Sequence, residues 1–100
     1  MPLSESQKKF LRGLGHKLKP VILVGEAGIS DALFKEFDST IGHHELIKIR
    51  VRAGNRSDRD AILDELCRRG SAIRVSRIGN TALLYRHNDD KPRIKLPDEH

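Results

Sequence analysis

The hydrophobic positions change their spacing along the chain, and each spacing predicts a different element. From residue 4 to about 16 they recur at helical intervals, and Ser4 followed by Gln7 matches the capping box with which helices begin. Val21 to Val24 is an unbroken apolar run, too short for a helix and too continuous for a strand with one solvated face. We therefore expect a helix followed by a buried central strand with Pro20 at its first position.

The middle of the chain predicts a second helix and then a strand with two unlike faces. Helical spacing runs from residue 30 or 31 to Ile41, and Gly42 is a typical C-terminal stop. Residues 45–53 then alternate strictly, which is typical of a strand with one buried and one solvated face. The buried face would carry Ile47, Ile49 and Val51, and the solvated face the cations Lys48, Arg50 and Arg52.

The next stretch predicts a third helix and a hairpin. Ser57 with Asp60 repeats the capping pattern, and apolar spacing continues as far as Gly70. Gly79-Asn80 is a two-residue hairpin signal, and it separates strand-like residues 71–78 from residues 81–86.

These elements predict one domain over residues 1–86. Residues 87–100 are polar and interrupted by prolines, so we expect a C-terminal tail that lays Ile94 and Leu96 against the domain. The order α-β-α-β-α-β-β implies helical crossovers between three parallel strands, with the fourth strand added antiparallel by the hairpin. The predicted fold class is α/β, an open-faced sandwich with a four-stranded mixed sheet whose cationic face is left uncovered.

Charge favours a polyanionic partner for this face. The 100 residues carry a net charge of +5, and the cations are concentrated in particular segments. The first helix presents Lys8, Arg12 and His16 four residues apart with Lys9 beside them, followed by Lys19, and the last two strands bring Arg74, Arg77 and Arg86. The N-terminus lacks the apolar run of a signal peptide and no window is long enough to span a membrane, so we expect a cytoplasmic monomer.

A possible phosphate site lies in the loop Gly25-Glu26-Ala27-Gly28. A strand that passes through a G-x-x-G turn into a helix leaves backbone N–H groups pointing outward, and glycines permit close approach of another backbone. The loop lacks the Lys-Ser/Thr of a nucleotide P-loop, so single-stranded RNA is the favoured ligand, as for the G-x-x-G loop of KH domains. Glu26 would repel a phosphate and would have to turn aside.

Enzyme chemistry finds little support. His43-His44-Glu45 has no third ligand at a familiar spacing, and adjacent histidines point in different directions. Cys67, the single cysteine, shares the apolar side of the third helix and is expected to be a core residue. We expect neither catalysis nor a cofactor.

Three separated blocks resemble one known family. They are Leu11 to Gly28, His44-Glu-Leu-Ile-Lys48 and Gly79 to Arg86, and together they are similar to the YhbY family, the bacterial stand-alone form of the CRM (chloroplast RNA splicing and ribosome maturation) domain. The resemblance implies an open α/β fold similar to the C-terminal domain of translation initiation factor 3, RNA binding, and association with precursors of the large ribosomal subunit. It implies that Gly25 and Gly28 belong to the RNA-binding loop, and that the Lys48 strand and Arg86 belong to a basic surface.

The leading hypothesis is therefore a non-enzymatic protein that binds ribosomal RNA during assembly of the large subunit. Two alternatives stay open. The basic face could meet an acidic patch of another protein, or a hydrolase could use His43, His44 or Cys67.

Overall fold

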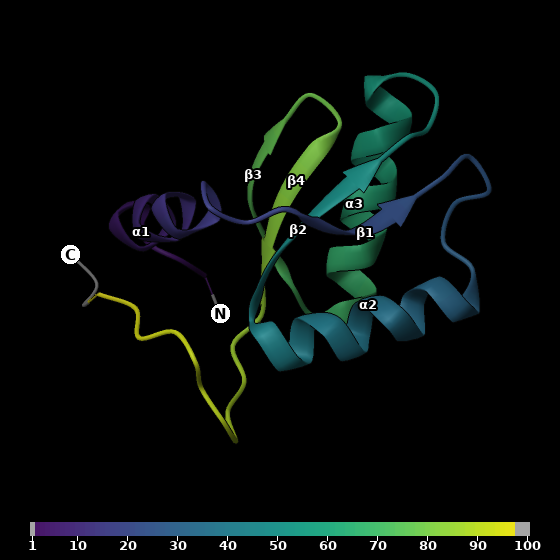
Figure 1. Ribbon diagram of the computed structural model, residues 1–100. Coiled ribbons are helices and arrows are strands. Elements are labelled where there is room, and N and C mark those ends of the chain that lie inside the picture. Colours follow the sequence, from purple (N-terminus) through teal and green to yellow (C-terminus); the bar gives the residue numbers. More distant parts are fainter. Residues whose placement is uncertain (1, 98–100) are drawn as a thin grey trace.

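The computed structural model describes residues 2–97, which form three helices and four strands in the predicted order (Figure 1). The elements are α1 (Glu5–Gly15), β1 (Pro20–Val24), α2 (Asp31–His44), β2 (Leu46–Val51), α3 (Arg56–Gly70), β3 (Ile73–Ile78) and β4 (Thr81–Tyr85). The capping box predicted for α1 is confirmed, because the Ser4 hydroxyl accepts from the Gln7 amide and the Gln7 side chain accepts from the Ser4 amide.

The sheet has the strand order β1-β2-β4-β3. β1 pairs with β2 in parallel, and β4 is antiparallel to both β2 and β3, so the mixed sheet is confirmed. The expectation that Val21 to Val24 form a central strand is wrong, because β1 is an edge strand. Only Ile22 and Val24 face the core, whereas Val21 and Leu23 are 55% and 53% exposed. An apolar run shows that both faces of a strand carry hydrophobic side chains, but it does not show that both faces are covered. In this fold only one face of β1 is covered.

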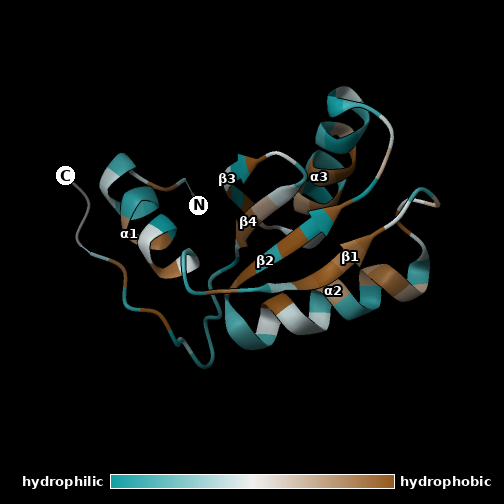
Figure 2. Ribbon diagram, turned by 45° about the horizontal axis from the view of Figure 1, so that its top comes forward, coloured by the Kyte–Doolittle hydropathy of each residue, from teal (hydrophilic) through white to brown (hydrophobic). Residues whose placement is uncertain are grey.

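The larger core lies between the sheet and α2 with α3, which cover the same face (Figures 1 and 2). Phe37 and Ile41 from α2 and Leu63 and Leu66 from α3 are essentially inaccessible to solvent. In Figure 2, β1 is almost wholly hydrophobic while β2 alternates, and the predicted inward set Ile47, Ile49 and Val51 lies in this core.

Two predicted helix boundaries are wrong. α2 continues through Gly42 to His44, and Glu45 ends it with a φ of 66°. Gly42 instead makes room for Arg86, since a Cβ there would lie 2.9 Å from the guanidinium. α3 begins after Asn55, which forms a reciprocal capping box with Asp58 in place of the predicted Ser57 and Asp60 pair.

A smaller core lies on the other face of the sheet, beneath α1. Leu3 and Leu11 pack with Leu46, Leu83 and Tyr85, together with neighbours from β3 and the tail. The end of α1 packs closely against β4, because a Cβ at Gly15 would lie 2.6 Å from a methyl group of Leu83. Phe10 and Leu14, which follow the same helical spacing, are each 40% exposed. α1 thus covers part of the face that the sequence predicted to be open.

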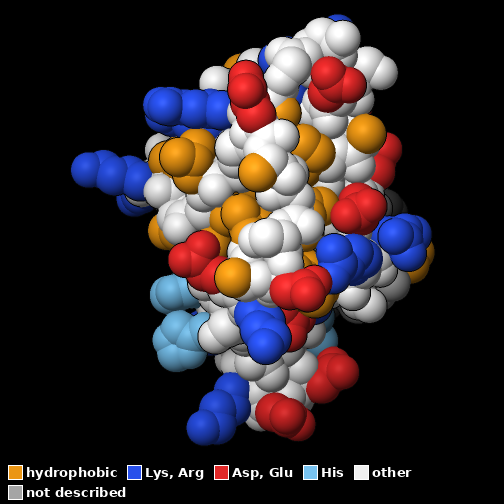
Figure 3. All heavy atoms as spheres, turned by 90° about the vertical axis from the view of Figure 1, so that its right-hand side faces the viewer, with side chains coloured by type: hydrophobic (Ala, Val, Ile, Leu, Met, Phe, Trp, Pro, Cys, Tyr) orange, Lys and Arg blue, Asp and Glu red, His pale blue; other side chains and the backbone are white. Residues whose placement is uncertain are grey.

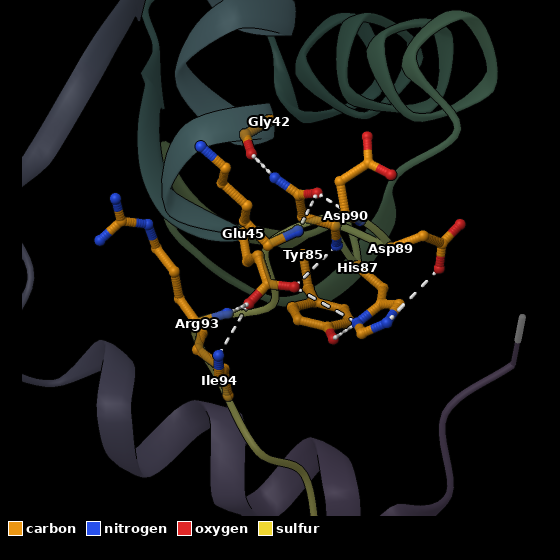
Figure 4. Close-up of polar contacts among 10 residues, drawn as sticks. Gly42, Glu45, Tyr85, His87, Asp89, Asp90, Arg93 and Ile94 are labelled. Atoms are coloured by element: carbon orange, nitrogen blue, oxygen red, sulfur yellow. Dashed lines mark hydrogen bonds and ion pairs between the residues drawn. The ribbon is translucent and has the colours of Figure 1, made fainter.

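The C-terminal tail crosses this smaller core, and the predicted packing of Ile94 and Leu96 against it is confirmed. Figure 4 shows the anchor, the buried carboxylate of Glu45, which accepts hydrogen bonds from the backbone N–H groups of Asn88, Arg93 and Ile94 at 2.6–2.7 Å. Further along the tail, the Gln7 side chain donates to the Pro97 carbonyl.

Candidate nucleic-acid interface

The uncovered part of the sheet borders a groove against the C-terminal end of α1, here called the α1 groove. It has a volume of about 400 Å³. Arg12 lines it from α1, His16 and Lys19 from the connection to β1, and Lys48 and Arg50 from β2. Among residues 2–97, no acidic side chain lines it. Five predicted site residues, which come from three segments of the chain, are therefore brought together around one concave surface.

The cationic surface continues along the edge strand. A second, shallower hollow, here called the β1 hollow, is lined by Val21 and Leu23 together with Lys19, Arg50 and Arg52. Lys19 and Arg50 line both depressions, which makes them one continuous surface. Val21 and Leu23 on β1 stay exposed beside the arginines of the neighbouring chain segment because no helix covers this face of β1.

In the part of the chain that the structure describes, the cations of this surface have no carboxylate partner. Within residues 2–97, no carboxylate oxygen lies within 4.0 Å of a side-chain nitrogen of Arg12, Lys19, Lys48, Arg50 or Arg52. The Nε of Arg50 is also buried and makes no hydrogen bond to any of these residues. This buried Nε is out of reach of a ligand, as is the equally unpaired Nε of Arg59, so external contacts of Arg50 fall to the outer nitrogens of its guanidinium.

Arg74 and Arg77 are placed on the opposite face of the sheet. They stand across from Leu84 and Ala82 in β4, which belong to the larger core. The Arg77 Nε lies 2.7 Å from Asp60, and Arg74 lies 3.5 Å from the same carboxylate and 3.9 Å from Asp64, so two carboxylates of α3 pair with the two arginines. The geometry does not bring these two predicted site residues to the α1 groove.

Arg86 is also engaged within the protein. Its guanidinium donates to the Asp38 carboxylate at 2.6 Å, to the Asp38 carbonyl and to the carbonyl of Gly70 at the end of α3. It thereby ties α2 to the C-terminus of α3, where a cation is electrostatically favoured. Its contacts are those of a structural residue, and it lies outside both depressions.

The remaining predicted cations of α1 lie outside the α1 groove. Lys8 lies 4.0 Å from Glu5, and Lys9 is exposed. They extend the positive potential of α1 without lining a depression.

The G-x-x-G loop is a turn closed by a hydrogen bond of 3.0 Å from the Gly28 N–H to the Gly25 carbonyl. Gly28 has a φ of 80°, which favours glycine, whereas Gly25 lies in open space, where a Cβ would have no neighbouring atom within 4 Å. The Ser30 hydroxyl caps α2 by accepting from the Leu33 amide. The backbone N–H groups of Gly28 and Leu33, which were predicted to be free for a ligand, therefore make hydrogen bonds within the protein. The N–H groups of the exposed residues Glu26 and Ala27 lie at the tip of the loop.

The G-x-x-G loop adjoins the cationic surface at the C-terminal end of β1. The Arg52 amide donates to the carbonyl of Val24, the residue before the loop, at 2.7 Å. β1 thus connects the two candidate features, with Lys19 before its first residue and the loop after its last (Figure 1). The end of the molecule that carries the loop shows acidic and basic side chains interspersed around hydrophobic ones (Figure 3).

The alternative catalytic residues do not form a common site. The rings of His43 and His44 contact each other edge to face, and Glu45 is buried and occupied by the tail. Residues 2–97 contain no group of three or more His, Cys, Asp or Glu side chains placed to hold a metal. Burial raises the pKa of Cys67 to about 11, which keeps its thiol protonated and unreactive near neutral pH.

Sequence reasoning missed the apolar and small side chains of the α1 groove. Ser76, Ile78 and Thr81 line it from the β3–β4 hairpin. A register irregularity between Arg74 and Ser76 resets which side chains of β3 face the groove. Strict alternation cannot reveal such a bulge, and no local signal in the sequence marks it.

The described part of the chain has no helix whose length and hydrophobicity would let it cross a membrane. Residues 3–86 match the sequence profile of the CRS1/YhbY (CRM) domain. The chain belongs to the CRS1/YhbY family. The matched segment ends at Arg86, so the tail that Glu45 anchors lies beyond the match.

Relatives extend over nearly the whole chain. A Pseudomonas aeruginosa protein named a probable RNA-binding protein is 42% identical over 96 residues, covering 96% of this chain and 91% of its own. A Haemophilus influenzae protein named an RNA-binding protein is 37% identical and covers 95% of each chain. The solution structure of a Staphylococcus aureus protein, described as a candidate RNA-binding protein, has a TM-score of 0.82 and 31% identity. It covers 96% of this CRM chain and 100% of its own.

Proposed function

We propose that this CRM protein binds RNA through the α1 groove and the β1 hollow. The observation that carries the proposal is the set of cations without carboxylate partners around a groove that no acidic residue lines, among residues 2–97. Phosphates supply the missing counter-charge, and neutralising them releases counterions from the nucleic acid. The names of the reported proteins from Pseudomonas aeruginosa, Haemophilus influenzae and Staphylococcus aureus support the same class of ligand.

The contacts fall into two kinds. Lys19, Lys48, Arg50 and Arg52 neutralise the backbone along β1 and β2, and Arg12 and His16 widen the surface at α1. The loop from Gly25 to Gly28 receives a further phosphate at the end of β1 through its exposed amides. The function is binding without catalysis.

We further propose that the RNA is ribosomal RNA in precursors of the large subunit. The support is the family resemblance, together with a surface that offers many phosphate contacts and no Phe, Tyr or Trp side chain within residues 2–97. Crosslinking in cells followed by sequencing of the bound RNA tests this proposal. Enrichment of large-subunit precursor RNA is expected, and a profile dominated by other RNA would refute the ribosomal assignment alone.

The direct test of RNA binding compares three polyanions at several salt concentrations. We expect affinity for RNA to exceed that for duplex DNA and for an acidic protein, and to fall linearly with the logarithm of salt concentration. The same cationic surface would suit an acidic protein patch if the protein were an interaction module of the ribosome. Tighter binding to an acidic ribosomal protein than to RNA would favour that function.

A further inference from the structure

The α1 groove has two chemically different parts. Cations form its walls, whereas the half-buried Leu18 and the exposed Pro20 contribute apolar surface and Ile78 stands at its margin with 82% exposure. A phosphate makes no use of apolar surface, which would only remove water from it. A site for phosphates alone therefore does not account for the composition of the groove.

We propose that the α1 groove holds the base of an unpaired nucleotide, with its phosphate on the surrounding cations. This inference rests on the proposed RNA binding and names the kind of RNA. A volume of about 400 Å³ lies within the range of about 300–1,000 Å³ typical of pockets for small organic molecules. A base is flat and largely apolar on its faces, with hydrogen-bonding groups at its edge.

Arg50 supplies the polar contact. Its side chain lines both the α1 groove and the β1 hollow and makes no ion pair within residues 2–97. A guanidinium can stack on a base with its plane and donate to an acceptor with its edge. The hydroxyls of Ser76 and Thr81 offer further donors and acceptors to the base edge.

The kind of RNA that the α1 groove can bind depends on which bases can enter it. In duplex RNA the base faces are stacked on their neighbours, and A-form geometry presents mainly phosphates and 2′-hydroxyls. A base reaches a concave site only when it is unpaired or is extruded at a cost in free energy. The α1 groove therefore selects single strands, loops and bulges over uninterrupted duplexes.

The test fills the groove without removing a charge. Ser76→Ile places an aliphatic side chain in the apolar part, where it cannot stack on a base as an aromatic ring would, and isoleucine is well accepted in strands. The matched control is Ser39→Ile on the exposed side of α2, away from both depressions. Each variant is titrated with a single-stranded RNA, with the same strand carrying abasic sites, and with a duplex of equal length.

The parent protein is expected to bind the intact strand about fivefold or more tightly than the abasic strand, the low end of the effect of one base contact. Ser76→Ile should lower affinity for the intact strand to that for the abasic strand and leave abasic binding unchanged, while Ser39→Ile should change neither. Ile78→Ser, at an exposed margin where folding is not at risk, should weaken the intact strand only.

Equal affinity of the parent for intact and abasic strands, or a preference for the duplex, would overturn the base site. In that case salt-dependent binding to all three RNAs would still support the proposed function. Absence of salt-dependent binding to any RNA would refute both proposals.

Discussion

The carboxylate of Glu45 accepts a hydrogen bond of 2.7 Å from the backbone N–H of Ile94, which lies 49 residues further along the chain. The same oxygen accepts from Arg93, and the other oxygen accepts from Asn88 (Figure 4). Burial raises the pKa of Glu45, but these three donors and nearby His87 outweigh it, so the net shift is downward. The ionised carboxylate therefore holds the tail against α1 and the sheet.

Glu45→Gln is expected to destabilise the protein by about 1–3 kcal/mol, because an amide cannot accept three backbone hydrogen bonds as a carboxylate does. Urea unfolding at pH 7 measures the loss. Asp90→Asn, an exposed change of the same kind in the tail, should have little effect. A free energy of unfolding equal to that of the parent would show that the anchor contributes nothing.

The same carboxylate predicts a pH dependence of stability. A group whose pKa is lower in the folded than in the unfolded protein stabilises the fold above its unfolded pKa, here 4.5. This contribution is lost as the pH falls below 4.5 through the folded pKa. The difference in unfolding free energy between the parent and Glu45→Gln should therefore shrink over that range, as urea titrations at successive pH values can measure. A difference that stayed constant down to the lowest pH would contradict it.

The unpaired cations predict a change in salt dependence. Replacing Lys48, Arg50 and Arg52 by Ala should weaken RNA binding and lower the log–log salt slope for single-stranded RNA by about two, if each neutralises one phosphate. Folding should be nearly intact, since Lys48 and Arg50 are half-buried, Arg52 is exposed, and none makes an ion pair within residues 2–97.

The matched control for this variant removes three exposed cations elsewhere. Lys35, Arg56 and Arg68 lie on α2 and α3, so their replacement by Ala changes the net charge equally without touching the α1 groove. If both triple variants lowered the slope by the same amount, net charge and not the sheet face would govern binding.

The fold could be predicted wherever the pattern of hydrophobic and polar residues depends only on neighbouring positions in the sequence. Alternation from Ile47 to Val51 identified the two faces of β2, and the Gly79-Asn80 signal identified the β3–β4 hairpin, both of which the register confirms. The edge position of β1 was not predictable in this way, because an apolar run does not state which strands or helices will be its neighbours.

The ion-pair partners of Arg74 and Arg86 could not be predicted from the sequence either. Arg74 pairs with a carboxylate 14 residues away and Arg86 with one 48 residues away, so their engagement depends on how the helices pack. Lys48 and Arg50 lie on a strand whose other face is visibly apolar in the sequence, so that their orientation followed from alternation. Counting cations identifies a basic protein, whereas only packing separates free cations from those already neutralised.

Cys67 predicts a test of the core on the α3 side. The residue is half-buried against the larger core, and Cys67→Ala should cost about 1 kcal/mol in unfolding free energy while leaving RNA affinity unchanged. With a pKa of about 11, about one thiol in a thousand is ionised at pH 8. The native protein should thus react with a bulky thiol reagent far more slowly than the urea-unfolded chain. Equal rates would show that the thiol is open to solvent.

The G-x-x-G loop offers two positions at which charge can be changed without new backbone angles, because the positive φ belongs to Gly28 while Glu26 and Ala27 are exposed. Glu26→Lys should tighten RNA binding by up to about 1 kcal/mol, since an attractive charge replaces a repulsive one beside the proposed phosphate. Ala27→Asp should weaken binding for the same reason. Neither change should move the melting temperature by much.

The control for the loop is Glu36→Lys, which makes the same change of charge at an exposed position of α2. Long-range attraction to RNA acts on both lysines, but a contact in the loop acts only on the one at position 26, and salt screens the distant charge more strongly. The loop variant should therefore keep its advantage at about 0.15 M salt while the α2 variant loses most of its own. If both lysines raised affinity equally at every salt concentration, the loop would contribute only to net charge. The phosphate site would then be confined to the α1 groove and the β1 hollow.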